Sequence, residues 1–181
     1  MPRALFALGA MALSLLLVSP ALAADTAKGN AGIKEAAGLC AAPYATVAFS
    51  CKTRDGYLVA VCTRENGLLQ LVFEQPGKAD TRVALPKDPA DKASVRVGYM
   101  LFSGGGGSYG GFTAADREYV AYSGFGKGWQ QAGLSEVRGE EHLAEHLCLP
   151  AAKPYDIGFP ILGEKAGYAQ DATQDFDPDV Q

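Results

Sequence analysis

The chain lacks the residues that many catalytic and nucleic-acid-binding signatures require. It has only two histidines and one tryptophan, and its 16 basic residues are outnumbered by 20 acidic ones. Without a basic surplus, the sequence gives no support for a face that binds nucleic acid. No C-x-x-C pair is present, and neither glycine cluster is followed by Lys-Ser or Lys-Thr. Zinc knuckles and phosphate-binding loops are therefore not indicated.

Long hydrophobic runs are also scarce, because the only one lies at residues 4–18. Arg3 precedes this run, and Ala21-Leu22-Ala23 supplies the small residues of a signal-peptidase site. We interpret residues 1–23 as a cleavable signal peptide. The run is too short for a comfortable bilayer span, and no later segment is long enough, so we expect a protein that does not span the membrane. The predicted location is periplasmic or secreted.

Four cysteines, at positions 40, 51, 62 and 148, form an even set in a chain that we expect to be exported. An oxidising compartment favours two disulfides, for which three pairings exist. We favour Cys51–Cys148, which ties the first strand to the last, and this leaves Cys40–Cys62.

Short β-type segments recur about every ten residues and are separated by turn signals. Asp55-Gly56, Asn66-Gly67 and Pro76-Gly77 are typical of tight turns. The predicted strands cover 47–51, 57–62, 68–73, 81–85, 95–102, 118–123 and 134–138, and 140–149 is a closing strand or a short helix. This pattern predicts an all-β fold, either a small antiparallel barrel or a sandwich, stapled by disulfides.

The predicted β domain spans residues 40–149. Before it, residues 24–39 are small and weakly patterned, which indicates a flexible leader or a short helix. After it, residues 150–181 form an acidic tail that we expect to be extended and partly disordered. Within this tail, Tyr155, Ile157, Phe159 and Ile161 alternate and could dock on the body as an extended segment.

Two glycine-rich segments stand out as candidate recognition loops. The first runs from Ser103 to Gly111 and includes Ser108 and Tyr109. Because ordering glycines costs entropy, the run suggests a flexible tip, a close approach of two backbones, or a loop that enters a partner's cleft. The second, residues 123–129, combines Phe125, Lys127 and Trp129 with glycines, as recognition tips do. The alternative is that its aromatic residues cap the core.

His142-Leu143-Ala144-Glu145-His146 matches the H-x-x-E-H motif of inverted zinc peptidases. That chemistry needs both histidines on one face of a helix and a third ligand elsewhere. Since the chain has no third histidine, the third ligand would be a carboxylate. A small zinc hydrolase is therefore the alternative function.

Two resemblances follow from these motifs. Phe49-Ser50-Cys51, Val61-Cys62, the glycine run and residues 119–128 resemble a family of small exported bacterial proteins with no assigned function, over residues 40–148. The order of Phe49 and Cys51, Ser103 to Tyr109, Lys127-Gly128 and Cys148 is also similar to the inhibitors of c-type lysozyme, which are small β-barrels. This second resemblance implies that Ser103 or Ser108, together with Lys127, lies on loops that reach the lysozyme's catalytic carboxylates. The chain departs from it in having Gly-Ser before the tyrosine and four cysteines.

We therefore expect a non-catalytic exported binding protein without a cofactor, whose partner is a protein such as a lysozyme. The candidate binding residues are Ser103, Ser108, Tyr109, Lys127 and Trp129. A third hypothesis for the function is a cell-envelope accessory protein that has no ligand.

Overall fold

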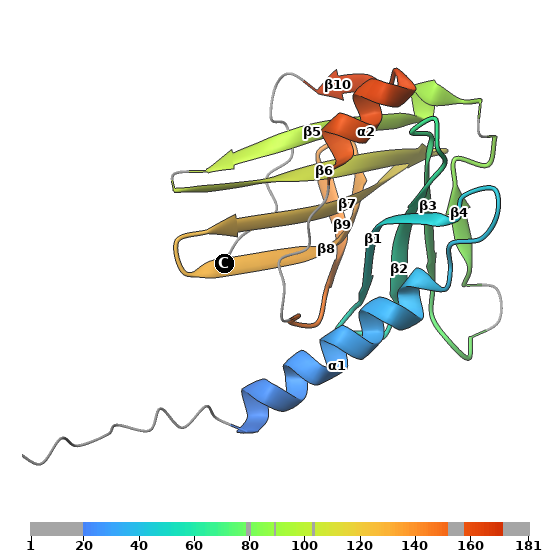
Figure 1. Ribbon diagram of the computed structural model, residues 1–181. Coiled ribbons are helices and arrows are strands. Elements are labelled where there is room, and N and C mark those ends of the chain that lie inside the picture. The colour runs from blue at the N-terminus through green and yellow to red at the C-terminus, as the bar shows by residue number, and fades with distance from the viewer. Residues whose placement is uncertain (1–19, 79–80, 89, 103, 152–157, 172–181) are drawn as a thin grey trace, which may run out of the picture.

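The computed structural model describes residues 20–78, 81–88, 90–102, 104–151 and 158–171 (Figure 1). Its body consists of two sheets, one with the strand order β1-β2-β3-β4 and one with the order β10-β5-β6-β7-β8-β9. The predicted all-β class is confirmed. Both sheets are open, so of the two predicted architectures the sandwich is correct and the barrel is not.

The small sheet is a meander of consecutive hairpins, as its turn residues predict. Its strands are β1 (Thr46–Lys52), β2 (Leu58–Thr63), β3 (Leu69–Glu74) and β4 (Val83–Leu85). The glycines of its predicted turns, Gly56, Gly67 and Gly77, all have positive φ, a conformation that costs glycine little. A short 3₁₀ helix (Lys92–Ser94) then leads into the large sheet.

The large sheet has more strands than the sequence predicted, and several of them are longer. Its antiparallel strands are β5 (Val95–Phe102), β6 (Gly105–Ala114), β7 (Arg117–Gly126), β8 (Trp129–Arg138) and β9 (Glu141–Leu147). The closing segment is a strand, which settles the choice between strand and helix in favour of the strand. Strand β6 was not predicted at all.

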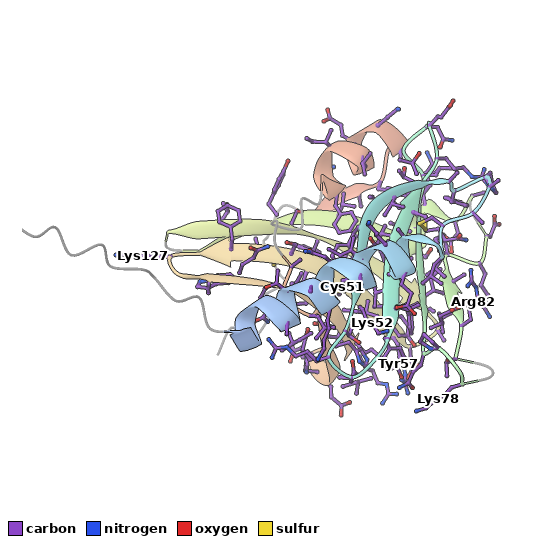
Figure 2. All side chains as sticks on the ribbon, turned by 60° about the horizontal axis from the view of Figure 1, so that its bottom comes forward. Cys51, Lys52, Tyr57, Lys78, Arg82 and Lys127 are labelled. Carbon is purple, nitrogen blue, oxygen red and sulfur yellow. A yellow bond between two sulfur atoms is a disulfide. The ribbon has the colours of Figure 1, made fainter. Side chains whose placement is uncertain are left out.

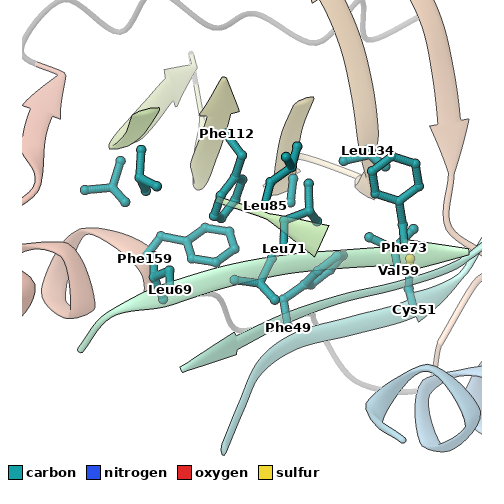
Figure 3. Close-up of a cluster of buried hydrophobic side chains, with 14 of the residues drawn as sticks. Phe49, Cys51, Val59, Leu69, Leu71, Phe73, Leu85, Phe112, Leu134 and Phe159 are labelled. Carbon is teal, nitrogen blue, oxygen red and sulfur yellow. The ribbon is translucent and has the colours of Figure 1, made fainter. Parts of the chain in front are cut away.

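The main core lies between the two sheets, where apolar side chains from both inner faces interdigitate (Figure 3). Phe49, Val59 and Leu71 contribute from the small sheet, and Phe112 and Leu134 from the large one. Each is at most 3% exposed. Burying a side chain of this size stabilises the fold by about 1.5–3 kcal/mol, so the contact between the sheets holds the sandwich together.

Two disulfides staple this body in the pairing that the sequence analysis favoured. Cys51–Cys148 joins β1 to the residue that follows β9, and therefore joins the two sheets. Beside it, Leu149 N–H donates to the carbonyl of Lys52 at 2.8 Å. Cys40–Cys62 ties the segment after the first helix to β2. The sheets are thus covalently linked at one corner.

The segment before the β domain is helical, so the flexible-leader interpretation of residues 24–39 is replaced by its helical alternative. Helix α1 (Pro20–Ala37) lies on the outer face of the small sheet. Ser50 Oγ donates to the carbonyl of Ile33 at 3.1 Å, and Lys52 pairs with Glu35 at 3.0 Å. A Cβ at Gly32 would overlap that of Lys52, so glycine permits the close approach of helix and strand. Residues 1–19 of the predicted signal peptide lie outside the described residues.

The expected extended tail is wrong for residues 159–171, which return to the body. Phe159 begins helix α2 (Phe159–Ala166), and strand β10 (Ala169–Asp171) pairs in parallel with β5. Phe159 is fully buried in the main core, and Tyr168 Oη accepts a hydrogen bond from Leu69 N–H at 2.8 Å. Gly167, with φ +71°, ends the helix in the left-handed conformation, which is common at helix ends. Tyr155, Ile157 and residues 172–181 lie outside the described residues.

Candidate functional site

The first glycine-rich segment is a strand rather than the predicted loop. Residues 105–111 belong to β6, which pairs with β5 on one side and with β7 on the other. Glycine is unfavourable in a strand, because it loses the most conformational entropy and offers no side chain to pack. The strand forms because both of its neighbours supply a continuous ladder of hydrogen bonds.

Two of these glycines are required because β6 approaches β7 closely. A Cβ at Gly105 would overlap the carbonyl oxygen of Phe125, and one at Gly107 would overlap that of Ser123. The neighbouring atoms are backbone, which cannot move aside cheaply. Of the three uses considered for the glycine run, the close approach of two backbones is therefore the one that the structure contains.

Strands β5 and β6 and strands β7 and β8 form adjacent hairpins that extend beyond the small sheet (Figure 1). We call residues 99–102, 104–107 and 123–131 the projecting hairpins. The second hairpin ends in the two-residue turn Lys127-Gly128, with Gly128 at φ +87°. Lys127 lies at the tip of this hairpin and is labelled in Figure 2.

The projecting hairpins carry an apolar patch on the face that becomes the core further along the sheet. Tyr99 and Leu101 continue the alternation of Val95 and Val97, which are buried. Leu101 lies opposite Gly106, which lies opposite Phe125 on β7. The side chains of Tyr99, Leu101 and Phe125 are 51%, 64% and 59% exposed. We call these three residues the apolar patch.

Charge is nearly absent from this part of the molecule. Residues 97–113 and 119–135 contain one charged side chain, that of Lys127. Lys127 is exposed, and no described acidic side chain forms an ion pair with it. The tip therefore presents one solvated cation near a neutral, partly aromatic surface, and this cation can pair with a carboxylate of a partner.

Of the four predicted binding residues that the structure describes, Lys127 alone lies at this tip as an exposed group. Ser108 and Tyr109 are in the interior of β6 and are 7% and 0% exposed, so the expectation that they lie on a loop is wrong. Trp129 is half-buried at the start of β8, with its indole ring against Gly126. Ser103 lies outside the described residues.

The outer face of the large sheet is filled by tyrosines lying over glycines. A Cβ at Gly98 would meet the ring of Tyr109, and one at Gly133 would meet the hydroxyl of Tyr122. Arg96 donates to Tyr109 Oη at 3.2 Å and forms an ion pair with Glu118 at 2.5 Å. Tyr109 is therefore held as a packing group and is not free to contact a partner.

Sequence reasoning missed a short motif here. Residues 106–110 read G-x-S-x-G, with Ser108 at its centre. In serine hydrolases this motif forms a sharp strand-to-helix turn that exposes the serine. Ser108 instead sits within β6, opposite Tyr99 and Ser123 in the two neighbouring strands, so the geometry of a nucleophile elbow is absent.

The H-x-x-E-H residues lie on a strand, so the helix that the zinc motif needs is absent. Glu145 and His146 are consecutive in β9 and therefore project to opposite faces. His142 Nε2 lies 3.2 Å from Glu145 Oε2, which places His142 on the Glu145 face. The two histidines therefore cannot ligate one ion as the motif requires. Among the described residues, no group of three or more His, Cys, Asp or Glu side chains is arranged to hold a metal.

Glu145 is the centre of a polar cluster on the outer face. Tyr122 Oη donates to Glu145 Oε1 at 2.6 Å, and the Ser135 hydroxyl donates to Glu145 Oε2. Burial, followed by the negative charge of Glu145, raises the pKa of Tyr122 well above its ordinary value. Tyr122 therefore remains a neutral donor, and its proton is not available for acid–base chemistry near neutral pH.

His146 bridges the two sheets on the inner side of β9. Its Nδ1 lies 2.6 Å from Asp55 Oδ2 in the β1–β2 turn, and its Nε2 lies 3.3 Å from Glu136 Oε1 on β8. Burial acts to raise the pKa of Asp55, but hydrogen bonds from Thr53 and His146 outweigh it and hold that pKa below its ordinary value. Tyr57 packs on the imidazole, with 4.6 Å between ring centroids. These contacts serve to join the sheets.

Sequence reasoning placed Tyr99 and Leu101 in a strand but did not identify them as exposed. The signal that the sequence offered was the lack of charged residues across 97–113. In the structure, the projecting hairpins extend beyond the small sheet, which therefore does not cover their apolar side chains. No described helix is long and apolar enough to cross a membrane. The expectation that the protein needs no cofactor stays a prediction.

No protein-family model matches this chain, and neither a curated protein nor a solved structure matches it.

Proposed function

We propose that this chain is a non-catalytic exported binding protein, periplasmic or secreted, that contacts a protein partner through its projecting hairpins. The observation that carries the proposal is the apolar patch of Tyr99, Leu101 and Phe125, which lies on paired strands near the exposed Lys127. Aromatic and aliphatic side chains held on strands give contact area at little entropic cost. The two disulfides of the body agree with an oxidising compartment.

A c-type lysozyme is the specific partner that we propose to test first. The resemblance to lysozyme inhibitors concerns Lys127, whose ammonium group is exposed at a hairpin tip and would pair with the enzyme's catalytic carboxylates. The buried positions of Ser108 and Tyr109 weigh against the part of that resemblance that concerns the serine loop. In this proposal, Lys127 and the apolar patch replace the serine loop as the contact.

The lysozyme version is tested by assaying a c-type lysozyme with excess purified protein. We expect inhibition by the wild-type chain and a loss of at least about tenfold with Lys127→Glu, because a like charge then faces the carboxylates. Lys78→Glu is the matched control, since Lys78 is also exposed but lies in the β3–β4 connection (Figure 2). A lysozyme that remains fully active in excess protein would eliminate this partner.

The wider proposal is tested by comparing variants in capture of partners from envelope extract. Leu101→Asp, at 64% exposure on the projecting hairpins, should abolish capture of a specific partner. Ile161→Asp, at 70% exposure on α2, should not affect that capture. Equal capture by the two variants would show that the apolar patch is not the contact surface.

A further inference from the structure

A second feature, remote from the projecting hairpins in the fold, is a cavity of about 480 Å³ at the other sheet. One side of it is formed by Ala45 and by Thr46, the first residue of β1. The other side is formed by Thr63, the last residue of β2, and by Arg64 and Asn66 of the β2–β3 turn. Its volume falls in the range of small-molecule sites, about 300–1,000 Å³.

Arg64 differs from four of the five other arginines that the structure describes, while the exposed Arg54 likewise forms no ion pair within the described residues. Arg82, Arg96, Arg117 and Arg138 each form an ion pair with an aspartate or glutamate. Arg64 forms none within the described residues, and its Nε is buried without a hydrogen-bond acceptor. A buried donor that lacks an acceptor destabilises the folded chain. One buried donor of this side chain therefore lacks an acceptor, and the residue lies in the lining of the cavity.

The guanidinium is also held in place before any ligand arrives. It lies over the ring of Tyr44, with 4.4 Å between Cζ and the ring centroid, and Tyr44 is itself 3% exposed. The turn that carries Arg64 is closed by two backbone hydrogen bonds, Arg64 N–H to Leu68 O at 3.0 Å and Gly67 N–H to Arg64 O at 2.9 Å. A fixed guanidinium loses little further entropy when it binds a planar acceptor.

The neighbouring polar groups complement this cation. Asn66 Oδ1 already accepts from Leu68 N–H at 3.2 Å, so its amide NH₂ remains as a donor. Thr46 adds a hydroxyl to the same cavity. A guanidinium, an amide NH₂ and a hydroxyl together match an acceptor with several oxygens, and arginine binds carboxylate and phosphate groups through two parallel hydrogen bonds.

We propose that this cavity binds the oxyanion group of a small solute, a carboxylate or a phosphate, with Arg64 as its principal ligand. The ring of Tyr44 packs against the guanidinium. In this proposal, the Asn66 amide and the Thr46 hydroxyl donate hydrogen bonds to the same oxyanion. Glu65 lies in the same cavity lining and carries the opposing charge. Its carboxylate limits the affinity for anions and favours a ligand whose remaining atoms are neutral or cationic.

The test is a titration of the isotopically labelled, disulfide-intact chain with sodium acetate and, separately, with sodium phosphate, followed by NMR of arginine Nε–H and backbone amides. Sodium chloride at equal ionic strength is the control. We expect saturable shifts confined to Arg64 and the β2–β3 turn. Saturation with acetate alone identifies a carboxylate site, and saturation with phosphate alone identifies a phosphate site. Shifts that are linear, or that chloride reproduces, would overturn the proposal.

Variants sharpen the test. Arg64→Gln should weaken binding at least about tenfold, and Arg64→Lys should weaken it less, because lysine keeps the charge but loses the planar fork. Glu65→Gln should strengthen binding about twofold, a gain that a misfolded variant would not produce. Arg82→Gln, which removes an exposed arginine paired with Glu74, is the matched control and should bind like the wild type. Unchanged affinity in Arg64→Gln would refute the assignment.

Discussion

The six-stranded sheet has two halves with the same alternation of side chains. They differ in whether a second layer of the protein covers their apolar face. In the body, Val95, Val97 and Phe112 face the small sheet and α2 and are buried. In the projecting hairpins, Tyr99, Leu101 and Phe125 continue the same face and are more than half exposed. The alternation of side chains is the same in both halves, so the extent of the opposing layer decides which apolar residues form the core and which form a surface.

The largest expected effect comes from truncating one phenylalanine in each half. Phe112→Ala should lower the free energy of unfolding by about 3–5 kcal/mol, because it leaves a cavity in the main core. Phe125→Ala should change it by less than about 0.5 kcal/mol, since its ring is 59% exposed. Urea unfolding of the two variants measures the difference. Similar losses would show that the projecting hairpins are packed as tightly as the body.

A smaller effect is expected from adding a methyl group where β6 meets β7. Gly107→Ala should destabilise the fold by about 1–3 kcal/mol, because the new Cβ overlaps the carbonyl of Ser123. Gly158→Ala is the control, since a Cβ there meets nothing within 4 Å. Thermal unfolding compares the two variants. If Gly107→Ala were as stable as the control, the glycine run would not be a close-packed strand.

The smallest effect concerns the ionic contact that joins the sheets in the body. The pKa of Asp55 is held below its ordinary value by Thr53 and His146 against the effect of burial, so its ionised form stabilises the folded chain. This contribution is complete above the unfolded pKa, about 3.9, and is lost as pH falls through the lower folded pKa. We expect it to be below about 1 kcal/mol, because Asp55 is half exposed.

Asp55→Asn tests this contact. Its stability should fall less steeply than that of the wild type as pH drops below about 4, and the two curves should converge at the lowest pH apart from a constant offset. Guanidinium unfolding at several pH values measures both curves. Parallel curves throughout would show that Asp55 gains nothing from its contact with His146.

Some of the fold follows from local pattern. Asp55-Gly56, Asn66-Gly67 and Pro76-Gly77 mark the small-sheet turns because positive φ suits glycine, and the β-branched residues between them alternate with the period of a strand. Other elements do not follow from such local signals. Residues 105–111 have no strand propensity of their own and become β6 only because β5 and β7 flank them. Residues 142–146 match a helical motif but pair with β8.

The candidate site divides in the same way. The sequence alone identified Lys127 on a glycine turn, because a two-residue turn is a local property. It did not identify Leu101 or the cavity at Arg64, because exposure and an unpaired guanidinium depend on which distant segments lie nearby.

The sequence by itself determined the all-β class, the small-sheet turns and the even set of cysteines, since each depends on residues close together or on composition. The tertiary structure alone decided that the glycine run would be a strand and that residues 159–171 would complete the body. It also decided that one end of the large sheet would extend beyond the small sheet. Those outcomes depend on contacts between segments far apart in the chain, which local preferences do not contain.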